Sequence, residues 1–217
     1  MQSSSAPRPR GRPRSFDRDA AAAAALGVLW AKGYEATTVE DLVAATGLAP
    51  SSLYAAFGNK HGVLQAALAR YDRDRDLTLM PLEAGSAGLD DLRQFLTGVR
   101  RAITAGEGPG CFMVNTATEV APRDDVIAQC TNRYRERIRD GVAAALDRAA
   151  VRGEIERSVT LDRARLVQSC LYGALVAARG GAAGEAAAVI DALERQIDVW
   201  AVDEQLTGTA PGGAGSP

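Results

Sequence analysis

The 217-residue sequence contains few of the residues on which enzymes and secreted scaffolds depend. It has one histidine, and its three cysteines, Cys111, Cys130 and Cys170, are too few and too widely spaced to predict a disulfide framework. His/Cys clusters with metal-ligand spacing are absent, as are a Gly-rich phosphate loop and a Gly-x-Ser-x-Gly turn. We therefore expect no catalytic residue, no metal site and no cofactor.

Long apolar runs are also absent. The sequence has no stretch of 18 or more apolar residues, and its first residues lack the apolar core of a signal peptide. These absences predict a cytoplasmic protein with reduced cysteines and no membrane partner. An all-helical hydrolase or a lipid-carrying protein is the alternative class, and a mobility shift with the DNA upstream of the gene would separate it from a DNA-binding protein.

Aromatic residues make up only 5% of the chain, whereas alanine is abundant. Alanine has the highest helix propensity of all residues, so this composition predicts an all-α fold. The formal net charge of −2 does not by itself indicate a nucleic-acid partner, but the distribution of charge does. The first fourteen residues contain no acidic residue and four arginines, Arg8, Arg10, Arg12 and Arg14.

Two short helices separated by a glycine are predicted within residues 37–57. Thr37, Thr38 and Glu40 have the spacing of a capping box, in which a hydroxyl satisfies an orphan N–H and a carboxylate binds back to the backbone. Gly47 then ends the first helix. This is the layout of a helix-turn-helix, whose second helix enters the major groove of DNA.

The second of these helices is expected to present a small, polar face to DNA. Leu53 and Phe57 lie four residues apart and are predicted to face the core. The residues predicted to contact bases or phosphates are Thr37, Thr38, Ser51, Ser52, Tyr54, Ala55 and Lys60. Because alanines occupy several positions of this helix, we expect few direct hydrogen bonds to bases. An ordinary solvated helix face is the alternative interpretation.

An extended basic arm precedes this motif. In PRPRGRPR (residues 7–14), proline prevents helix formation and keeps the arginines extended, which suits the narrow minor groove of A·T-rich DNA. Arg10, Arg12 and Arg14 are therefore predicted to contact DNA, and together with the glycine and proline between them they resemble an AT-hook. A disordered solubilising tail is the alternative interpretation.

The sequence from Phe16 to Leu64 reads FDRDAAAAAALGVLWAKGYEATTVEDLVAATGLAPSSLYAAFGNKHGVL. By these residues the chain resembles the TetR family of bacterial one-component transcription regulators. Matching features are the Trp, Gly and Tyr near the end of the first helix, the Thr-Thr pair, the Leu-Tyr pair with its Phe, and the Lys that opens a fourth helix. The resemblance implies an all-helical homodimer with a DNA-binding head and a larger ligand-sensing domain, but it does not identify the effector.

The predicted organisation has four segments. They are a disordered basic arm (1–15), a helix-turn-helix DNA-binding domain (16–62), a ligand-sensing and dimerisation domain (63–206) and a disordered tail (207–217). Beyond the motif, helices are expected over residues 18–32, 89–105, 124–152, 161–179 and 185–206, with a further helix that starts at residue 60 and runs into a charge-alternating segment.

A small-molecule pocket is expected in the sensing domain, where an apolar segment with a few polar side chains follows a Gly-Pro-Gly break. The candidate ligand-binding residues are Phe112, Asn115, Thr116, Glu119, Tyr134, Gln168 and Tyr172. The alternative is that most of them are core residues, with Asn115 and Glu119 satisfying helix ends.

Cys111 precedes this segment, and a thiol at a helix N-terminus acquires a lowered pKa and can react with electrophiles or oxidants. A buried, inert thiol is the more common case, and it is the interpretation that we favour for Cys111.

The last two helices are predicted to form a homodimer. The predicted interface residues are Gly173, Ala177, Ile190, Leu193, Ile197 and Trp200, of which the last four have coiled-coil spacing. Packing within one subunit is the alternative for this small-residue face.

Two heads on a two-fold axis would bind a palindromic operator in double-stranded DNA. We expect a repressor that a small molecule releases from this operator, although the sequence does not distinguish repression from activation.

Overall fold

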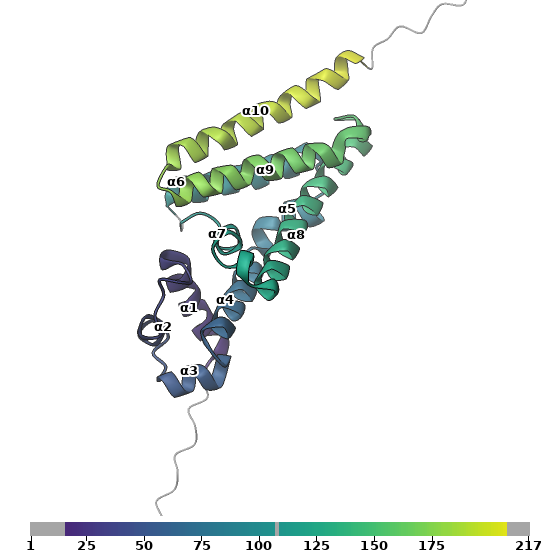
Figure 1. The fold of residues 1–217 in the computed structure, drawn as a ribbon. Helices are drawn as coiled ribbons and strands as arrows, with labels where there is room; N and C mark the ends of the chain where they lie inside the picture. The colour runs from purple at the N-terminus through teal and green to yellow at the C-terminus, as the bar shows by residue number, and fades with distance from the viewer. Residues whose placement is uncertain (1–15, 107–108, 208–217) are drawn as a thin grey trace, which may run out of the picture.

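The computed structural model describes residues 16–106 and 109–207, with side chains described as far as Ala201. Over these ranges the chain folds into helices joined by turns, which confirms the predicted all-α class (Figure 1). The α-helices are α1 (Arg18–Lys32), α2 (Val39–Thr46), α3 (Pro50–Phe57), α4 (Lys60–Asp74), α5 (Asp76–Ala84), α6 (Leu89–Ala105), α7 (Phe112–Glu119), α8 (Asp125–Val151), α9 (Thr160–Arg179) and α10 (Ala183–Thr207). The predicted arm, with Arg10, Arg12 and Arg14, and nearly all of the predicted tail lie outside the described residues.

Helix α1 shows how local sequence sets the helix ends. The Asp17 side chain accepts hydrogen bonds from the amides of Asp19 (2.9 Å) and Ala20 (3.2 Å), which satisfies two otherwise unpaired N–H groups. At the other end Gly33 has a φ of 88°, a conformation that favours glycine. The alanine run allows close packing, because the small side chains of α1 lie buried against α4. The predicted range of residues 18–32 is confirmed.

The molecule has a head and a body, joined through α4 and α7 (Figure 1). Helices α1, α2 and α3 form the head with the first turns of α4, while α9 and α10 lie side by side at the opposite end. The long α8 packs against α5, α6, α7 and α9. Buried side chains form one continuous core through both parts, and the predicted boundary after residue 62 falls inside α4.

A separate helix α5, which the sequence analysis did not predict, follows α4 after a break at Arg75. The charge-alternating segment around this break forms ion pairs with α8. Arg137 of α8 binds Asp72 (2.6 Å), Asp76 (2.8 Å) and Glu83 (2.6 Å), so one guanidinium joins α4 and α5 to α8. This cluster fixes the direction in which α4 leaves the body toward the head.

Candidate DNA-binding surface and ligand cavity

Helix α2 begins with a capping box that lies one residue later than predicted. Thr38 is the N-cap: its Oγ1 accepts from the Asp41 amide at 3.1 Å, and Asp41 Oδ2 accepts from the Thr38 amide at 2.9 Å. Thr37 is buried, and its hydroxyl donates to the Gly33 carbonyl at 2.6 Å. The predicted Thr37–Glu40 box is therefore wrong, and so is the predicted DNA contact by Thr37, because its side chain faces the core.

Asp41 also joins α2 to α1. Lys32 Nζ lies 2.6 Å from Asp41 Oδ1. The hydrogen bond from Lys32, followed by that from the Thr38 backbone, lowers the pKa of Asp41 to about 2. The carboxylate is thus ionised at neutral pH and holds the two helices of the motif together.

The turn and the second helix follow the predicted layout. Gly47 adopts the left-handed conformation (φ 67°, ψ 10°), and its amide donates to the Val43 carbonyl at 2.9 Å. Pro50 occupies the first turn of α3, where its missing N–H has no cost. Leu53 and Phe57 are buried, as their spacing predicted. These contacts fix which face of α3 remains outside.

The outer face of α3 carries most of the predicted DNA-contacting residues. Ser51, Tyr54 and Ala55 are exposed, and Ser52 is half-buried. Tyr54 keeps 39% of its surface accessible, which is high for a tyrosine on a helix whose other aromatic residue is buried. Thr38, the N-cap of the preceding helix α2, is also exposed. The structure therefore leaves these five side chains accessible to a duplex, and their contacts with DNA remain a prediction.

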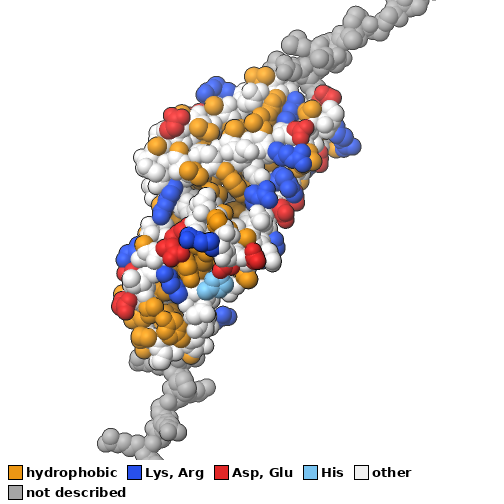
Figure 2. All heavy atoms as spheres, in the orientation of Figure 1, with side chains coloured by type: hydrophobic (Ala, Val, Ile, Leu, Met, Phe, Trp, Pro, Cys, Tyr) orange, Lys and Arg blue, Asp and Glu red, His pale blue; other side chains and the backbone are white. Residues whose placement is uncertain are grey.

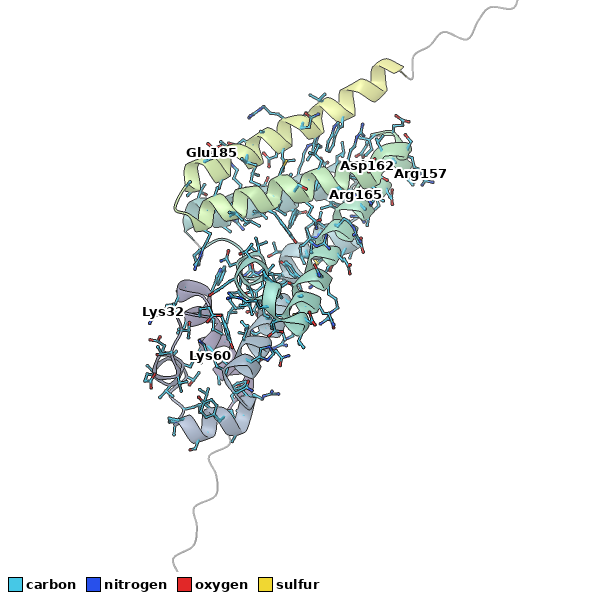
Figure 3. The ribbon with its side chains drawn as sticks, in the orientation of Figure 1. Lys32, Lys60, Arg157, Asp162, Arg165 and Glu185 are labelled. Carbon is cyan, nitrogen blue, oxygen red and sulfur yellow. The ribbon has the colours of Figure 1, made fainter. Side chains whose placement is uncertain are left out.

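Lys60 is engaged within the head. Its Nζ lies 4.5 Å from the centroid of the Tyr34 ring and 3.5 Å from the Glu35 carbonyl oxygen. Figure 3 shows Lys60 on the head, far from the Arg157, Asp162 and Arg165 end of the molecule. A phosphate contact by Lys60 would thus require its ammonium to be shared with, or to leave, the turn between α1 and α2.

The head is negatively charged without the arm. Residues 16–62 contain five acidic residues and three basic ones, a net charge of −2, whereas residues 1–15 carry four arginines and no acid. The arm is therefore the main source of positive charge next to the motif in the sequence. This charge matters because duplex DNA, a polyanion, repels a negatively charged surface.

Polar contacts connect the head to α7, α8 and α9 of the body. Glu119, at the end of α7, accepts from the amides of Tyr34 (3.0 Å) and Glu35 (2.9 Å). Arg179, at the end of α9, donates to the carbonyls of Trp30 (2.8 Å) and Ala31 (3.2 Å), where the C-terminal end of α1 attracts a cation. His61 Nε2 lies 2.7 Å from Asp124 Oδ2, which adds a third contact where α4 begins.

A cavity of about 460 Å³ lies in the body and reaches α1 of the head. Of the predicted ligand-binding residues, it brings together Tyr134 and Tyr172. Other lining residues, which were not predicted to bind a ligand, include Trp30, Tyr71, Arg75, Phe95 and Arg101. They come from α1, α4, α6 and the break between α4 and α5, and no local motif marks them. The volume lies within the range of small-molecule sites.

The other five predicted ligand-binding residues do not line this cavity. Phe112 and Thr116 are buried in the core, and Asn115 donates to the Pro109 carbonyl at 2.9 Å. Gln168 donates to the Arg135 carbonyl, and Glu119 binds the head. The structure therefore does not place these five with Tyr134 and Tyr172, because short-range periodicity does not show which face of α7 or α9 turns toward the cavity.

Cys111 is the N-cap of α7 and lines the cavity, but it is not activated. Burial raises the pKa of its thiol and outweighs the hydrogen bond from the Tyr71 hydroxyl, which donates to the sulfur at 3.4 Å. Because the position is desolvated, the structure supports the buried, inert thiol, which is the interpretation that the sequence favours.

The predicted coiled-coil seam packs inside the subunit. Ile190, Leu193, Ile197 and Trp200 are buried against the chain's own helices, because α10 lies along α9 and α6. The guanidinium of Arg163 also covers the Trp200 ring at 5.0 Å. The prediction that these four residues form the dimer interface is therefore corrected. Their spacing reflects packing within one chain. Gly173 is exposed and Ala177 half-buried, so neither is covered in the same way.

The sequence of the chain is similar to those of known regulatory proteins. Residues 22–67 match the family described as bacterial regulatory proteins, tetR family. The chain is 34% identical over 180 residues to the HTH-type transcriptional repressor ComR of Escherichia coli (strain K12), covering 81% of this chain and 86% of that protein. It is 29% identical over 147 residues to the uncharacterized HTH-type transcriptional regulator YezE of Bacillus subtilis (strain 168), covering 67% of this chain and 76% of that protein.

Solved structures extend the similarity to the body. The TetR family transcriptional regulator CifR, as a cysteine mutant complexed with 26-bp double-strand operator DNA, is 27% identical with a TM-score of 0.72, covering 85% of this chain and 98% of that chain. A transcriptional regulator from Agrobacterium tumefaciens shares the fold, with a TM-score of 0.73 at 18% identity over 85% of this chain and 97% of that chain. Across the described residues, none of the helices combines the length and apolarity needed to cross a membrane.

Proposed function

Because this chain belongs to the TetR family of DNA-binding transcription regulators, we propose that it is a homodimeric repressor released from a palindromic operator by a small molecule. The observation that carries the proposal is the exposed outer face of α3, held by the buried pair Leu53 and Phe57. The 34% identical relative is named a repressor, and a neighbouring structure contains operator DNA. The proposal includes no catalytic activity and a cytoplasmic location.

The operator contacts are assigned to two parts of the chain. Ser51, Ser52, Tyr54 and Ala55 of α3 enter the major groove with Thr38 beside them, while the arm of residues 7–14 follows the minor groove. Phosphate contacts by Tyr54, Lys60 and the arginines fix the register. The negative charge of residues 16–62 supports a necessary role for the arm.

A ligand in the cavity acts on the head through α1. Trp30 belongs to α1 and lines the cavity, and its backbone carbonyl accepts from Arg179. A ligand that displaces Trp30 therefore changes how α1 sits on α7 and α9. Release from DNA requires that the ligand binds this displaced geometry more tightly than the DNA-bound one.

The dimer is assigned to the exposed face of α9 and its neighbour α10. Leu166 and Val176 of α9 and Val199 of α10 are about half exposed (49–50%), so apolar surface remains available here for a partner subunit. Gly173 lies between the two α9 residues, and a Cβ there would meet no atom within 4 Å, so a partner helix can approach closely. In the space-filling view, hydrophobic side chains interrupt the charged surface at this end of the molecule (Figure 2).

Binding of the full-length protein to the promoter fragment upstream of its own gene tests the proposal. Fluorescence anisotropy at about 150 mM salt should give an affinity about a thousandfold higher for this fragment than for a scrambled duplex. Circular dichroism must show in parallel that the protein is helical and folded. Equal affinity for both duplexes by the folded protein would contradict the proposed function.

A further inference from the structure

The cavity is lined by aromatic rings. Trp30 and Tyr71 meet edge to face with ring centroids 5.3 Å apart, and Tyr134 lies 6.1 Å from Tyr71. Phe95 and Tyr172 line the same cavity. Rings presented in this way favour a flat, apolar guest, because stacked and edge-to-face contacts add to the free energy of burial.

The charged side chains on the cavity wall are of one sign. Arg75 and Arg101 line it, and no Asp or Glu is among the described residues that do so. Elsewhere in the body, arginines are matched with carboxylates, as Arg137 is with three. Neither Arg75 nor Arg101 has a carboxylate within ion-pair distance in the part of the chain that the structure describes.

Arg75 is the more enclosed of the two arginines. Its guanidinium carbon lies 5.0 Å from the centroid of the Tyr71 ring, so it rests on the aromatic wall. Its Nε is shielded from solvent and has no hydrogen-bond partner among the described residues. Arg101 is exposed to solvent. A buried N–H without an acceptor costs free energy, which a bound acceptor would recover.

The remaining polar groups do not neutralise this charge. Burial raises the pKa values of Tyr71, Tyr134 and Tyr172, and also that of Cys111, so phenols and thiol stay protonated at neutral pH. The Trp30 indole Nε1, another donor, is buried without an acceptor among the described residues. The cavity is thus rich in donors and carries uncompensated positive charge.

We propose that this cavity binds an organic anion, whose flat aromatic body lies among the rings and whose carboxylate or sulfonate accepts from the guanidinium of Arg75. The inference rests on the effector role proposed above and names the chemical class of the effector. A guanidinium is a fork of donors that matches such an anion and binds it with charge-assisted hydrogen bonds. A neutral guest of the same shape would leave Arg75 Nε unsatisfied.

Two fluorescent probes with the same aromatic body test the class. 8-Anilinonaphthalene-1-sulfonate carries a sulfonate that N-phenyl-1-naphthylamine lacks. Titrated into the full-length protein without DNA, the sulfonate should bind about tenfold more tightly than the neutral probe. The Arg75→Gln variant should lose this preference while still binding the neutral probe, which shows that its cavity is intact. Arg195→Gln, at an exposed position outside the cavity, is the matched control and should keep the preference.

A variant that fills the cavity tests whether the two probes bind there. Gly98 lines it, and a Cβ there would meet no atom within 4 Å, so Gly98→Leu has room for its first side-chain atom and should weaken both probes about tenfold or more. The inference is overturned if the neutral probe binds as tightly as the sulfonate, if Arg75→Gln keeps the preference, or if Gly98→Leu changes neither affinity. Failure of the proposed function is distinct, because it would appear as loss of operator preference without any probe.

Discussion

The carboxylate of Glu119 accepts a hydrogen bond from the backbone amide of Tyr34 at 3.0 Å, and so joins the end of α7 to the turn after α1. A second bond from the Glu35 amide, at 2.9 Å, makes the contact bidentate. The body thus supplies the acceptor for two amides of the turn between α1 and α2. The orientation of the head thus depends on a residue 85 positions away in the sequence.

Removal of this carboxylate should loosen the head. Glu119→Ala leaves two backbone amides without their acceptor, so we expect a loss of about 2 kcal/mol in the free energy of unfolding, because bonds to charged groups are the stronger ones. Hydrogen exchange at Tyr34 and Glu35 should become faster. Denaturant unfolding and exchange measured by mass spectrometry check both effects. Glu136→Ala, at an exposed position, is the control, and equal stability of the two variants would contradict the expectation.

The arm should set the salt dependence of DNA binding. Replacing Arg8, Arg10, Arg12 and Arg14 with glutamine keeps the length and removes the charge. Each phosphate contact contributes about 0.9 to the slope of log affinity against log salt, so the slope should flatten by about 3 to 4 per subunit if all four arginines make contact. Anisotropy titrations at several salt concentrations measure it. An unchanged slope would exclude a role for the arm.

The hydroxyl of Tyr54 should contribute equally to the affinity for all duplexes. Tyr54→Phe removes only the exposed hydroxyl, and a lost phosphate contact of about 1 kcal/mol weakens binding about fivefold. The loss should be the same for operator and scrambled DNA. Ser169→Ala, which removes an exposed hydroxyl from α9, should have no effect. A loss confined to the operator would instead assign Tyr54 to base recognition.

The exposed face of α9 should hold the dimer. Val176→Glu places a charge on this face and should convert the dimer to a monomer, because a buried unpaired carboxylate is costly. Light scattering coupled to size exclusion measures the mass directly. Val126→Glu is matched in exposure, at 51% against 50%, but lies at the opposite end of the body on α8, and it should remain dimeric. Dimers in both variants would locate the interface elsewhere.

Stability in acid should depend on Asp41. The folded pKa of about 2 lies below the ordinary value of 3.8, so the contribution of this carboxylate is present above pH 4 and is lost as the pH falls toward 2. Asp41→Asn should therefore have a lower Tm than the parent protein at pH 7, and the gap should narrow below pH 4. Thermal unfolding followed by circular dichroism from pH 7 to pH 2 tests this. A gap that is constant with pH would show that ionisation of Asp41 does not stabilise the fold.

The sequence analysis predicted the features that depend on residues a few positions apart. Asp17 and Gly33 delimit α1 because a cap and a left-handed glycine act on the nearest turn. Leu53 and Phe57 predicted the buried side of α3, since a helix turns the same face inward every three or four residues. Even here the capping box was assigned one residue too early, because Thr37 and Thr38 are locally equivalent until one of them is buried.

The sequence by itself determined the all-α fold, the helix-turn-helix and the exposed face of α3, because propensity, capping and periodicity are local. Only the tertiary structure decided that Ile190 and Ile197 pack inside the subunit, that Glu119 binds the head, and that Arg75 lies on the wall of a cavity. An apolar stripe fits a helix of its own chain as well as one of a partner. Which one covers it, and which side chains from distant helices converge on one cavity, is set by how the whole chain packs.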